Sequence, residues 1–542
     1  MSLSNGNLTF STSSGTASQK GIQAGIGVTS GKWYYEARVE VYDGNNAFGW
    51  WESRAAYSNY PTYYWDIGAN NASPSVGAVE SSTGTNSGTA PTLVIGDIVG
   101  VALDYGGDTI TYYKNGTQTV QTTGMNIPDG LVLIPTIQSW TGASNNGASV
   151  NFGQNPTFSG NTTAGTYTDS NGKGLFKYQP PSGFLALCED NLPTPAIADP
   201  GKHFKTVLYS GDTSQTRGVV GVGFTPDLVW LKNRTATDWH RFTDSIRGGG
   251  MTLYSNSTNA ESAFDANGYI QSLDSDGFSV NRGSNPGNAV NGTGTYVAWC
   301  WKAGGAAVSN TDGTITSQVS ANQDAGFSIV SYTGTGASGS IGHGLSNEPE
   351  FVIIKDRDDG SYNWVTYHKD YTNSQYIQKL NLPDEQQDAG GTYALTRGSS
   401  TLGVLGGLAI NTLGNRYISY CWHSVENFSK IGKFTGNADP DGPFILCGFK
   451  PAWVMVKNID DTGGRNWGIQ DSSRKSTNPC DKHLKADSTE VENSGLADST
   501  YQIDLLSNGF KVRNNTGIWN NSGETIIFMA FAESPFQTAN AK

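Results

Sequence analysis

The sequence predicts an all-β protein in which several domains follow one another along the chain. Aromatic residues make up 11% of the 542 residues and charged residues only 15%, while Gly, Ser, Thr and Asn are abundant. Aromatic and Thr side chains fit the pleated surface of a sheet, and Gly and Asn supply turns. No stretch shows helical periodicity over more than about three turns, and a chain of this length is expected to hold roughly four domains.

One sequence block occurs three times in the C-terminal two-thirds of the chain. Each copy consists of a turn with Gly and Pro, four or five apolar residues and a lysine, at residues 223–232, 344–355 and 448–457. A short apolar run that is bounded by a turn is typical of a strand with both faces buried. The block therefore predicts such a strand in each of three repeats.

The neighbours of this block recur in the same order. A triplet of an aromatic residue, Ser or Thr, and Gly precedes it, and a bulky strand closes each unit. A single tryptophan follows each lysine, namely Trp239, Trp364 and Trp467. A period of about a hundred residues is long enough for whole small domains. The sequence therefore predicts three tandem β-sandwich-like repeats, with boundaries at residues 204–305, 326–427 and 428–542.

Two short segments connect the predicted domains. Residues 189–203 contain Pro193, Pro195 and Pro200. Because proline fixes φ, this segment is predicted to be a stiff linker. Residues 306–325, rich in Gly, Ala, Ser and Thr, are predicted to be one more exposed strand or a loose connector.

The N-terminal third has strand and hairpin signals of its own. Residues 31–41 are aromatic and β-branched, and apolar residues alternate along residues 96–104. A Gly-rich turn leads from the second run into residues 109–113, which end at a Lys-Asn-Gly turn. Two alternating runs joined by such a turn indicate a β-hairpin.

These N-terminal motifs resemble the SPRY family. The motifs follow the family's order: Gly-Lys-Trp-Tyr-Tyr-Glu at 31–36, Gly-Asp-Ile-Val-Gly at 96–100, Tyr-Lys-Asn-Gly at 113–116 and Val-Asn-Phe-Gly-Gln at 150–154. The resemblance implies that residues 1–188 form a concanavalin-like β-sandwich that serves as a binding module. An insertion at residues 157–174 displaces the family's last segment.

Charge and cysteine content bear on partners and compartment. The formal net charge is −13 and the pI is near 4.9, which argues against nucleic acid as a partner. No run is apolar enough for membrane insertion, and the first residues lack the features of a signal peptide. Cys300 and Cys421 occupy the position that holds Ala530 in the third repeat. This predicts a small buried group and no disulfide, and we expect the repeats' tryptophans and cysteines to fill interiors in a protein made in a reducing cytoplasm.

The sequence contains no convincing cofactor or metal motif. Residues 334–339 match the pattern Gly-x-Gly-x-x-Gly, but the Gly-rich sequence that follows cannot form the helix that would hold a pyrophosphate, which predicts a turn. The six histidines never occur as a zinc pair on a helix, and no nucleophile elbow or phosphate-binding loop is present. The acidic runs at 356–359 and 460–461 offer oxygen ligands for Ca²⁺, against the simpler expectation of a solvated loop. We therefore expect a non-enzymatic protein with no cofactor and no bound metal.

Glycan cleavage is the enzymatic alternative. It needs two carboxylates about 5–10 Å apart across the sugar. Nothing in the sequence pairs the carboxylates that stand near aromatic residues, which are Glu52, Asp66, Asp238 and Asp244.

Glycan binding has candidate residues in the N-terminal domain. Aromatic residues are dense at 48–65. The loop aromatics Tyr57, Tyr60 and Trp140 are the predicted ligand-binding residues, because they offer flat faces to a sugar ring. Core packing or contact with a neighbouring subunit is the alternative interpretation.

A SPRY module followed by such repeats resembles structural proteins of tailed bacteriophages, whose repeats end in strings like Met-Ala-Phe-Ala-Glu-Ser-Pro-Phe at residues 529–536. The resemblance implies a virion protein, a tail fibre or related appendage, with other virion proteins as partners and a homotrimer expected. We expect adhesion to a host-surface glycan, where several weak sites on one particle gain avidity. Two alternatives stay open: a purely structural capsid-decoration or baseplate-linking protein, and a glycan depolymerase.

Overall fold

The structure of this protein is a computed structural model. In it the chain forms two compact units, residues 1–194 and residues 195–535. Among the described residues the regular structure is β-strand, apart from the single-turn 3-10 segments η1 (Glu189–Asn191) and η2 (Pro200–Lys202). This confirms the predicted all-β class, and no helix in the described part could cross a membrane. The structure describes residues 2–4, 8–12, 20–24, 26–41, 46–52, 64–70, 73–139, 146–191, 194–285, 287–389, 395–406, 409–493, 501–515 and 518–535.

The first unit is a sandwich of two β-sheets. The strands of the larger sheet are β1 (Ser2–Ser4), β2 (Thr9–Thr12), β4 (Lys32–Val41), β8 (Thr85–Gly88), β9 (Ile98–Asp104), β10 (Thr109–Lys114), β11 (Thr117–Thr123), β13 (Asn146–Asn151) and β14 (Leu185–Ala186). Those of the smaller sheet are β3 (Lys20–Gln23), β5 (Asn46–Glu52), β6 (Tyr64–Asn70), β7 (Ser73–Ser81) and β12 (Leu133–Ser139). The orders are β1-β2-β13-β4-β9-β10-β11-β8, with β14 parallel to β4, and β3-β12-β5-β6-β7.

Alternating side chains of β4 and β9 fill the space between these sheets. Tyr35 and Val101 are cross-strand partners, and both are buried. The Tyr35 ring lies 6.0 Å from the ring of Trp50 on β5, which pairs with Trp65 on β6. Residues on one face of a strand recur every second position, so the alternation seen in the sequence became the core. The predicted β9–β10 hairpin is confirmed.

Glu36 anchors the segment that closes the first unit. Its carboxylate is fully buried and accepts hydrogen bonds from the backbone N–H groups of Lys177 and Tyr178, both at 2.8 Å. Burial raises the pKa of Glu36, although these hydrogen bonds counteract the rise. Phe176, just beyond the insertion, packs on Tyr34 with ring centroids 5.2 Å apart. The last Glu of the Gly-Lys-Trp-Tyr-Tyr-Glu motif therefore holds the closing segment on the outer face of the larger sheet.

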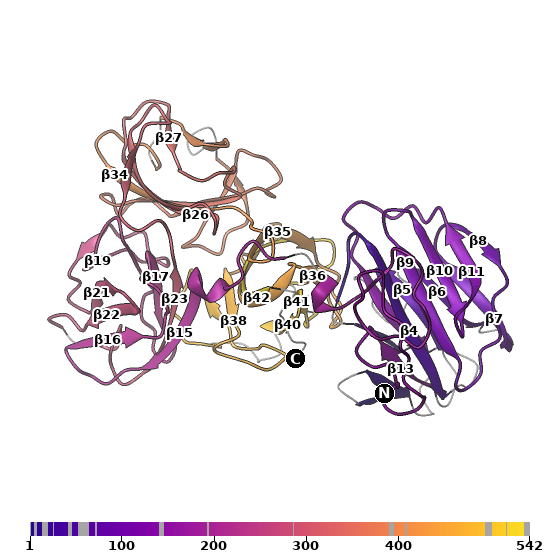
Figure 1. Ribbon diagram of the computed structural model, residues 1–542. Helices are drawn as coiled ribbons and strands as arrows, with labels where there is room; N and C mark the ends of the chain where they lie inside the picture. The colour runs from indigo at the N-terminus through magenta and orange to yellow at the C-terminus, as the bar shows by residue number, and fades with distance from the viewer. Residues whose placement is uncertain are drawn as a thin grey trace. The chain divides into compact units, whose positions relative to one another are not determined.

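The second unit contains three copies of one strand arrangement (Figure 1). The main sheet of the first repeat has the order β15 (Phe204–Ser210), β23 (Thr295–Trp301), β17 (Leu228–Asn233), β18 (Arg241–Asp244). In the second repeat the matching strands are β26 (Phe327–Thr333), β34 (Arg416–Trp422), β28 (Phe351–Asp356) and β29 (Val365–His368). In the third repeat they are β35 (Ser429–Thr435), β42 (Thr525–Pro535), β37 (Phe449–Asn458) and β38 (Gly468–Asp471). The small sheets are β16 (Thr216–Val220), β22 (Gly277–Asn281), β21 (Tyr269–Asp274); β27 (Gly339–Gly342), β33 (Thr401–Val404), β32 (Leu395–Arg397); and β36 (Phe444–Leu446), β41 (Gly509–Val512), β40 (Ile503–Leu506). The repeated sequence block therefore forms the same strand, β17, β28 or β37, in each copy.

Short strands extend this common plan. They are β19 (Met251–Thr252), β20 (Ser262–Ala263), β24 (Val308–Asn310), β25 (Ser317–Asn322), β30 (Tyr376–Lys379), β31 (Gln387–Asp388) and β39 (Leu484–Lys485). The connector at 306–325 supplies two of them, because β24 and β25 join the main sheet of the second repeat beyond β26. Residues 334–338 lead from β26 into the strand β27 and not into a helix, as predicted for the Gly-x-Gly-x-x-Gly pattern.

The three repeats share one hydrophobic core. On β23, Ala298 and Cys300 belong to a cluster confined to the first repeat. The intervening Trp299 and Trp301 belong to a cluster that also contains residues of the other two repeats. The ring of Trp301 lies 6.3 Å from that of Trp422 in the second repeat and 5.7 Å from that of Phe531 in the third. The bulky closing strands are thus buried on both faces, and one of these faces joins the repeats.

One interior position closes a ring of contacts around this core. It is the residue that precedes the fourth strand of each main sheet: His240 before β18, Trp364 before β29 and Trp467 before β38. Its three hydrogen bonds are Trp364 Nε1 to Tyr254 O (2.8 Å), Trp467 Nε1 to Lys379 O (3.2 Å) and His240 Nε2 to Lys485 O (3.0 Å). The second repeat thereby contacts the first, the third contacts the second, and the first contacts the third. The repeats are therefore arranged cyclically within one chain.

Trp239 departs from the expectation that the repeats' tryptophans fill interiors. It is 41% exposed, and the neighbouring His240 occupies the position held by Trp364 and Trp467. The Trp230 indole donates to Nδ1 of His240 at 2.8 Å, so the imidazole carries its proton on Nε2. A shift of one residue moves a side chain to the other face of a strand. Aligning Trp239 with the other two tryptophans was therefore wrong by one position.

Candidate functional site

The ligand-binding residues predicted from the sequence, Tyr57, Tyr60 and Trp140, lie outside the residues that the structure describes. Their role stays a prediction.

The four candidate carboxylates for glycan cleavage lie in different settings. Glu52 and Asp66 are buried on β5 and β6, where the Trp51 indole donates to Asp66 at 3.2 Å. Asp244 is fully buried at the contact between two repeats. Asp238 lines an open pocket, and of the four it is the one that a ligand could reach.

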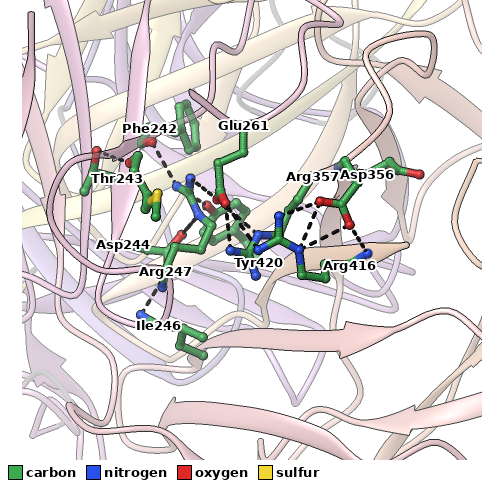
Figure 2. Close-up of polar contacts among 12 residues, drawn as sticks. Phe242, Thr243, Asp244, Ile246, Arg247, Glu261, Asp356, Arg357, Arg416 and Tyr420 are labelled. Carbon is green, nitrogen blue, oxygen red and sulfur yellow. Dashed lines mark hydrogen bonds and ion pairs between the residues drawn. The ribbon is translucent and has the colours of Figure 1, made fainter. Parts of the chain in front are cut away.

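An ionic network fills the 1–2 interface, which we define as the contact between the first and second repeats (Figure 2). Arg247 lies between Asp244 (Nε to Oδ2, 2.5 Å) and Glu261 (Nη1 to Oε2, 3.2 Å), and neither Arg247 nor Asp244 has an exposed side-chain atom. From the second repeat, Tyr420 donates its hydroxyl to Asp244 at 2.8 Å, and Arg357 binds both oxygens of Glu261 at 3.1 and 2.8 Å. Burial alone would lower the pKa of the Arg247 guanidinium, but Asp244, Tyr420 and Glu261 raise it above its ordinary value. The arginine therefore stays charged inside the protein.

The 3–1 interface, between the third and first repeats, contains the same network. Arg474 lies 2.5 Å from Asp471 and 3.2 Å from Glu492. From the first repeat, Arg234 binds both oxygens of Glu492 at 3.0 and 2.8 Å, and the Trp299 indole donates to Asp471 at 3.0 Å. Buried charges are stable when their hydrogen-bonding capacity is met, and both networks meet it with residues from two repeats.

The 2–3 interface, between the second and third repeats, replaces each of these groups. His368 stands where Asp244 and Asp471 stand, because each of the three pairs with the corresponding residue of β28, β17 or β37. Tyr371 follows it by three residues, as the arginines do in the other repeats, and Met529 replaces Tyr420. The space between His368, Met529 and their neighbours is too small for a water molecule. The residues around this space form no ion pair with one another, and the polar contacts between the two repeats lie elsewhere, for example Gln386 to Asp460 at 3.2 Å.

The repeated lysine lies inside the protein at the end of its strand. Lys232, Lys355 and Lys457 have no exposed surface. Lys232 donates to three backbone carbonyls at 2.7–3.2 Å, one of them in the third repeat. Burial lowers the pKa of each lysine to about 8. These hydrogen bonds to backbone carbonyls indicate that the lysines hold the neighbouring loops in place.

The acidic runs considered for Ca²⁺ also act within the fold. Asp356 is fully buried and accepts two backbone N–H groups of its own turn at 2.9 and 3.0 Å. Asp358 is paired with Arg416 at 2.5 Å, and Asp461 with Arg465 at 2.6 Å. Across the described residues no group of three or more His, Cys, Asp and Glu side chains is placed to hold a metal ion.

The cysteines follow the prediction for the repeats. Cys300, Cys421 and Ala530 are fully buried, which confirms that this position holds a small interior group. Burial raises the pKa of the Cys421 thiol to about 12. A thiol in this state is not a nucleophile at neutral pH.

An aromatic and polar pocket opens on the first repeat. Its volume of about 410 Å³ lies within the range of small-molecule sites. The loop between β17 and β18 and the segment around β20 supply its walls. The lining residues are Thr237, Asp238, Trp239, Arg241, Tyr254, Asn259, Ala260, Ser262, Asp265 and Asn267.

Trp239 gives the pocket an exposed aromatic face. Because His240 takes the interior position, the indole of Trp239 is left outside and is 41% exposed. Its ring stands edge-on to that of Tyr254, with centroids 5.0 Å apart. Tyr254 donates its hydroxyl to the buried carboxylate of Asp265 at 2.5 Å, which holds the phenol in place.

The charges of Arg241 and Asp265 offset each other within the protein. Arg241 donates to the carbonyl of Gly268 at 2.7 Å, to the carbonyl of Trp239 at 3.0 Å and to Asp265 at 3.3 Å. Only 4% of its side chain is exposed. The other oxygen of Asp265 accepts the backbone N–H of Asn267 at 2.9 Å. This pair therefore shapes the pocket and presents little free charge to a ligand.

Three lining side chains keep groups for a ligand. Asp238 accepts a hydrogen bond from Asn233 through Oδ2 at 2.9 Å, and no described residue bonds to its Oδ1. The side chains of Thr237 and Asn259 make no hydrogen bond within the described chain. The pocket thus combines an aromatic face with a carboxylate oxygen, a hydroxyl and an amide.

The second repeat supports one wall of this pocket. The backbone N–H of Glu261 donates to the carbonyl of Arg357 at 2.8 Å, beside the bidentate ion pair of the two side chains. Gly360 approaches the same wall so closely that a Cβ there would lie 3.2 Å from the nitrogen of Ala260. The ionic network of the 1–2 interface therefore also positions residues 259–262.

The fold defines a β-rich protein with an N-terminal β-sandwich followed by further β domains, and the family comparisons agree. The model of the SPRY domain matches residues 32–155. The model described as Domain of unknown function (DUF7483) matches residues 199–535, and the chain belongs to this family. That match covers all three repeats, from β15 to β42.

The structural comparisons concern the N-terminal unit. The chain is similar to the crystal structure of the SPRY domain of human HERC1 (18% identity, 27% of this chain and 89% of that chain covered, TM-score 0.21). It is similar to a human SPRY domain (18%, 27% and 92%, TM-score 0.20) and to the TRIM65 PSpry domain (12%, 28% and 84%, TM-score 0.20). No curated protein matches the chain.

Two parts of this arrangement were missed from the sequence. The ionic networks have a local signal, Asp-Ser-x-Arg, at residues 244–247 and 471–474. A second signal is the sequence after the repeated lysine, which reads Asn-Arg, Asp-Arg and Asn-Ile in the three copies. The pocket has no such signal, because its walls are loops of one repeat.

Proposed function

We propose that this chain is a non-enzymatic virion protein of a tailed bacteriophage, a tail fibre or related appendage, that binds a glycan on the host surface. The observation that carries the proposal is the exposed indole of Trp239 beside polar groups that the protein leaves unused. A sugar ring has an apolar C–H face that packs on an aromatic ring, and hydroxyls that bond to carboxylates and amides. The phage assignment rests on the resemblance of the repeats and of residues 529–536.

The SPRY unit supplies a second contact in this proposal. SPRY domains are interaction modules, and this one would bind another virion protein while the three-repeat unit faces the host. Several copies on one particle would convert weak sugar binding into avidity. The chain would then act as a link between particle and cell.

The pocket's carboxylates favour binding over cleavage. A glycosidase uses two carboxylates, one of which must give or take a proton. Among the described lining residues, Asp265 already accepts Tyr254 and Arg241, which leaves Asp238 as the carboxylate with an available oxygen. One available carboxylate suits recognition of hydroxyl groups.

The test compares cell binding of the full chain with that of the Trp239→Ala variant. Fluorescently labelled protein should bind host cells, lose that binding when surface sugars are oxidised by periodate, and lose most of it in the variant. Leu413→Ala is the matched control, because Leu413 is 75% exposed on the second repeat. A reducing-sugar assay on the host polysaccharide checks for depolymerase activity. Equal binding by wild type and Trp239→Ala would refute a role for this pocket.

A purely structural role is the second candidate, and the shared core of the three repeats favours it. A unit whose repeats bury their largest side chains against one another suits a decoration or linking piece of a particle. Antibody labelling of virions in electron micrographs separates the candidates. Label on the capsid, together with no binding of the purified chain to cells, would favour the structural role.

A further inference from the structure

We propose that the pocket at Trp239 selects sugars by charge: it takes a neutral or amino sugar and excludes one that carries a carboxylate or sulfate group. Asp238 is the residue that sets this specificity. The inference rests on the proposed glycan binding and adds the chemical class of the ligand.

The charges that face the pocket leave one uncompensated group. Arg241 and Asp265 form a pair with their hydrogen bonds made inside the protein. Asp238 has a carboxylate oxygen without a partner in the described chain and only partial burial. An anionic ligand would therefore meet a carboxylate and find no free cation among the described lining residues to offset it.

Lys232, the cation of the neighbouring strand β17, is directed into the protein. Lys232 is fully buried and does not line the pocket. Its ammonium group donates to three backbone carbonyls, so its protons are used. Lys232 therefore offers no donor to the ligand.

Asp238 and Trp239 together favour a positive group. An ammonium over an indole face is attracted by the ring's electrons, most strongly for tryptophan. The same ammonium donates charge-assisted hydrogen bonds to a carboxylate oxygen. An amino sugar can make both contacts, and a neutral sugar can donate a hydroxyl to Asp238 while stacking on Trp239. A uronic, sialic or sulfated sugar places like charges together.

The experiment uses the full chain on an array of neutral, amino, uronic, sialic and sulfated oligosaccharides. Wild type should bind neutral and amino sugars at least about tenfold more tightly than acidic ones of the same linkage. Asp238→Asn should reduce this ratio to near one, mainly by weakening the amino sugars and admitting the acidic ones. Glu348→Gln is the matched control, because Glu348 is an exposed acid of the second repeat, and it should leave the ratio unchanged. Thermal melting checks that each variant is folded.

The outcomes separate this inference from the proposed function. Both the charge selection and the proposed glycan binding are supported by three results together. The wild type binds neutral or amino sugars, Trp239→Ala abolishes this binding, and Asp238→Asn binds charged and neutral sugars alike. Binding of acidic sugars that Trp239→Ala abolishes overturns the charge selection and leaves glycan binding standing. If the chain binds no sugar in a way that depends on Trp239, both the charge selection and the proposed glycan binding are overturned.

Discussion

At the 1–2 interface a buried arginine, Arg247, is enclosed by Asp244, Glu261 and the hydroxyl of Tyr420. At the equivalent place in the 2–3 interface stand Tyr371, His368 and Met529. Transferring a charge from water to an interior costs several kcal/mol per ion, and the cost is recovered only when every partner is present. The comparison shows that such a network is kept complete or removed completely: the third interface has lost the acid, the arginine and the partner's arginine together.

The two kinds of interface also differ in what they specify. Hydrophobic surfaces tolerate substitution as long as volume is kept. A bidentate arginine and a buried carboxylate match only their own geometry. We infer that the ionic networks determine which repeats pair in the ring, while the aromatic core supplies most of the burial.

The largest effect is expected from removing the arginine at the centre of either network. Arg247→Ala would leave Asp244 and Glu261 buried with less compensation, and Arg474→Ala would do the same to Asp471 and Glu492. Breaking a buried pair by removing one partner costs about 3–5 kcal/mol. Urea denaturation of the full chain, followed by tryptophan fluorescence, measures the loss.

The matched control is Arg217→Ala, whose partner Asp212 lies at the surface. An exposed pair contributes about 0–1 kcal/mol. If Arg217→Ala destabilises the protein as much as Arg247→Ala does, the network carries no special weight.

The same residues show what the sequence could predict. Periodicity and the repeated block predicted the buried strands, the closing strands and the small residue at Cys300, because burial of a strand leaves a regular apolar pattern. The networks depend on side chains from two repeats, and the sequence of a single repeat does not show which other repeat it contacts. Asp-Ser-x-Arg and the Arg, Arg, Ile series at residues 234, 357 and 459 would have shown that two interfaces share chemistry which the third lacks.

The pocket at Trp239 is harder to predict from the sequence than the ionic networks are. Trp239 resembles the interior tryptophans of the other repeats in spacing, and a one-residue offset decides that it faces outward. That offset depends on His240 fitting between Trp230 and the third repeat. Only packing across the repeats resolves it.

A smaller effect is expected when one hydrogen bond of the network is removed and its shape is kept. Tyr420→Phe deletes the hydroxyl that donates to Asp244 at 2.8 Å. A hydrogen bond to a charged group contributes about 1.5–3 kcal/mol, and Arg247 remains to hold the carboxylate. The free energy of unfolding should therefore fall by less than in Arg247→Ala. In the double variant the two losses should not add, because both residues bind the same carboxylate.

The 2–3 interface should respond to pH through His368. Burial lowers the pKa of this imidazole to about 3, although the nearby carbonyl of Phe528 counteracts the shift; Lys369, Arg397 and Lys433 lower it further. The unfolded chain takes up the proton near pH 6.5, so the stability from a neutral His368 is present above pH 6.5 and is lost as the pH falls toward 3. The slope contributed by this residue is at most about 1.4 kcal/mol per pH unit.

His368→Gln should flatten that part of the profile, measured as the free energy of unfolding between pH 7 and 5. His203→Gln is the comparison variant, since His203 is only half-buried; partial burial lowers its pKa from the ordinary value. An unchanged slope in His368→Gln would show that the 2–3 interface does not sense protons through this residue.

The smallest effect is expected at the residue that replaces the arginine. Tyr371→Phe removes a hydroxyl that bonds to Thr366 at 2.9 Å and to Gln378 at 3.2 Å, both within the second repeat. A neutral hydrogen bond contributes about 0.5–1.5 kcal/mol net, and the ring of Tyr371 stays packed in the shared core. The loss, measured under the same denaturation conditions, should be several-fold below that of Arg247→Ala. A loss as large as the arginine's would mean that the third interface contains a polar network of equal weight, and the contrast between the two kinds of interface would not hold.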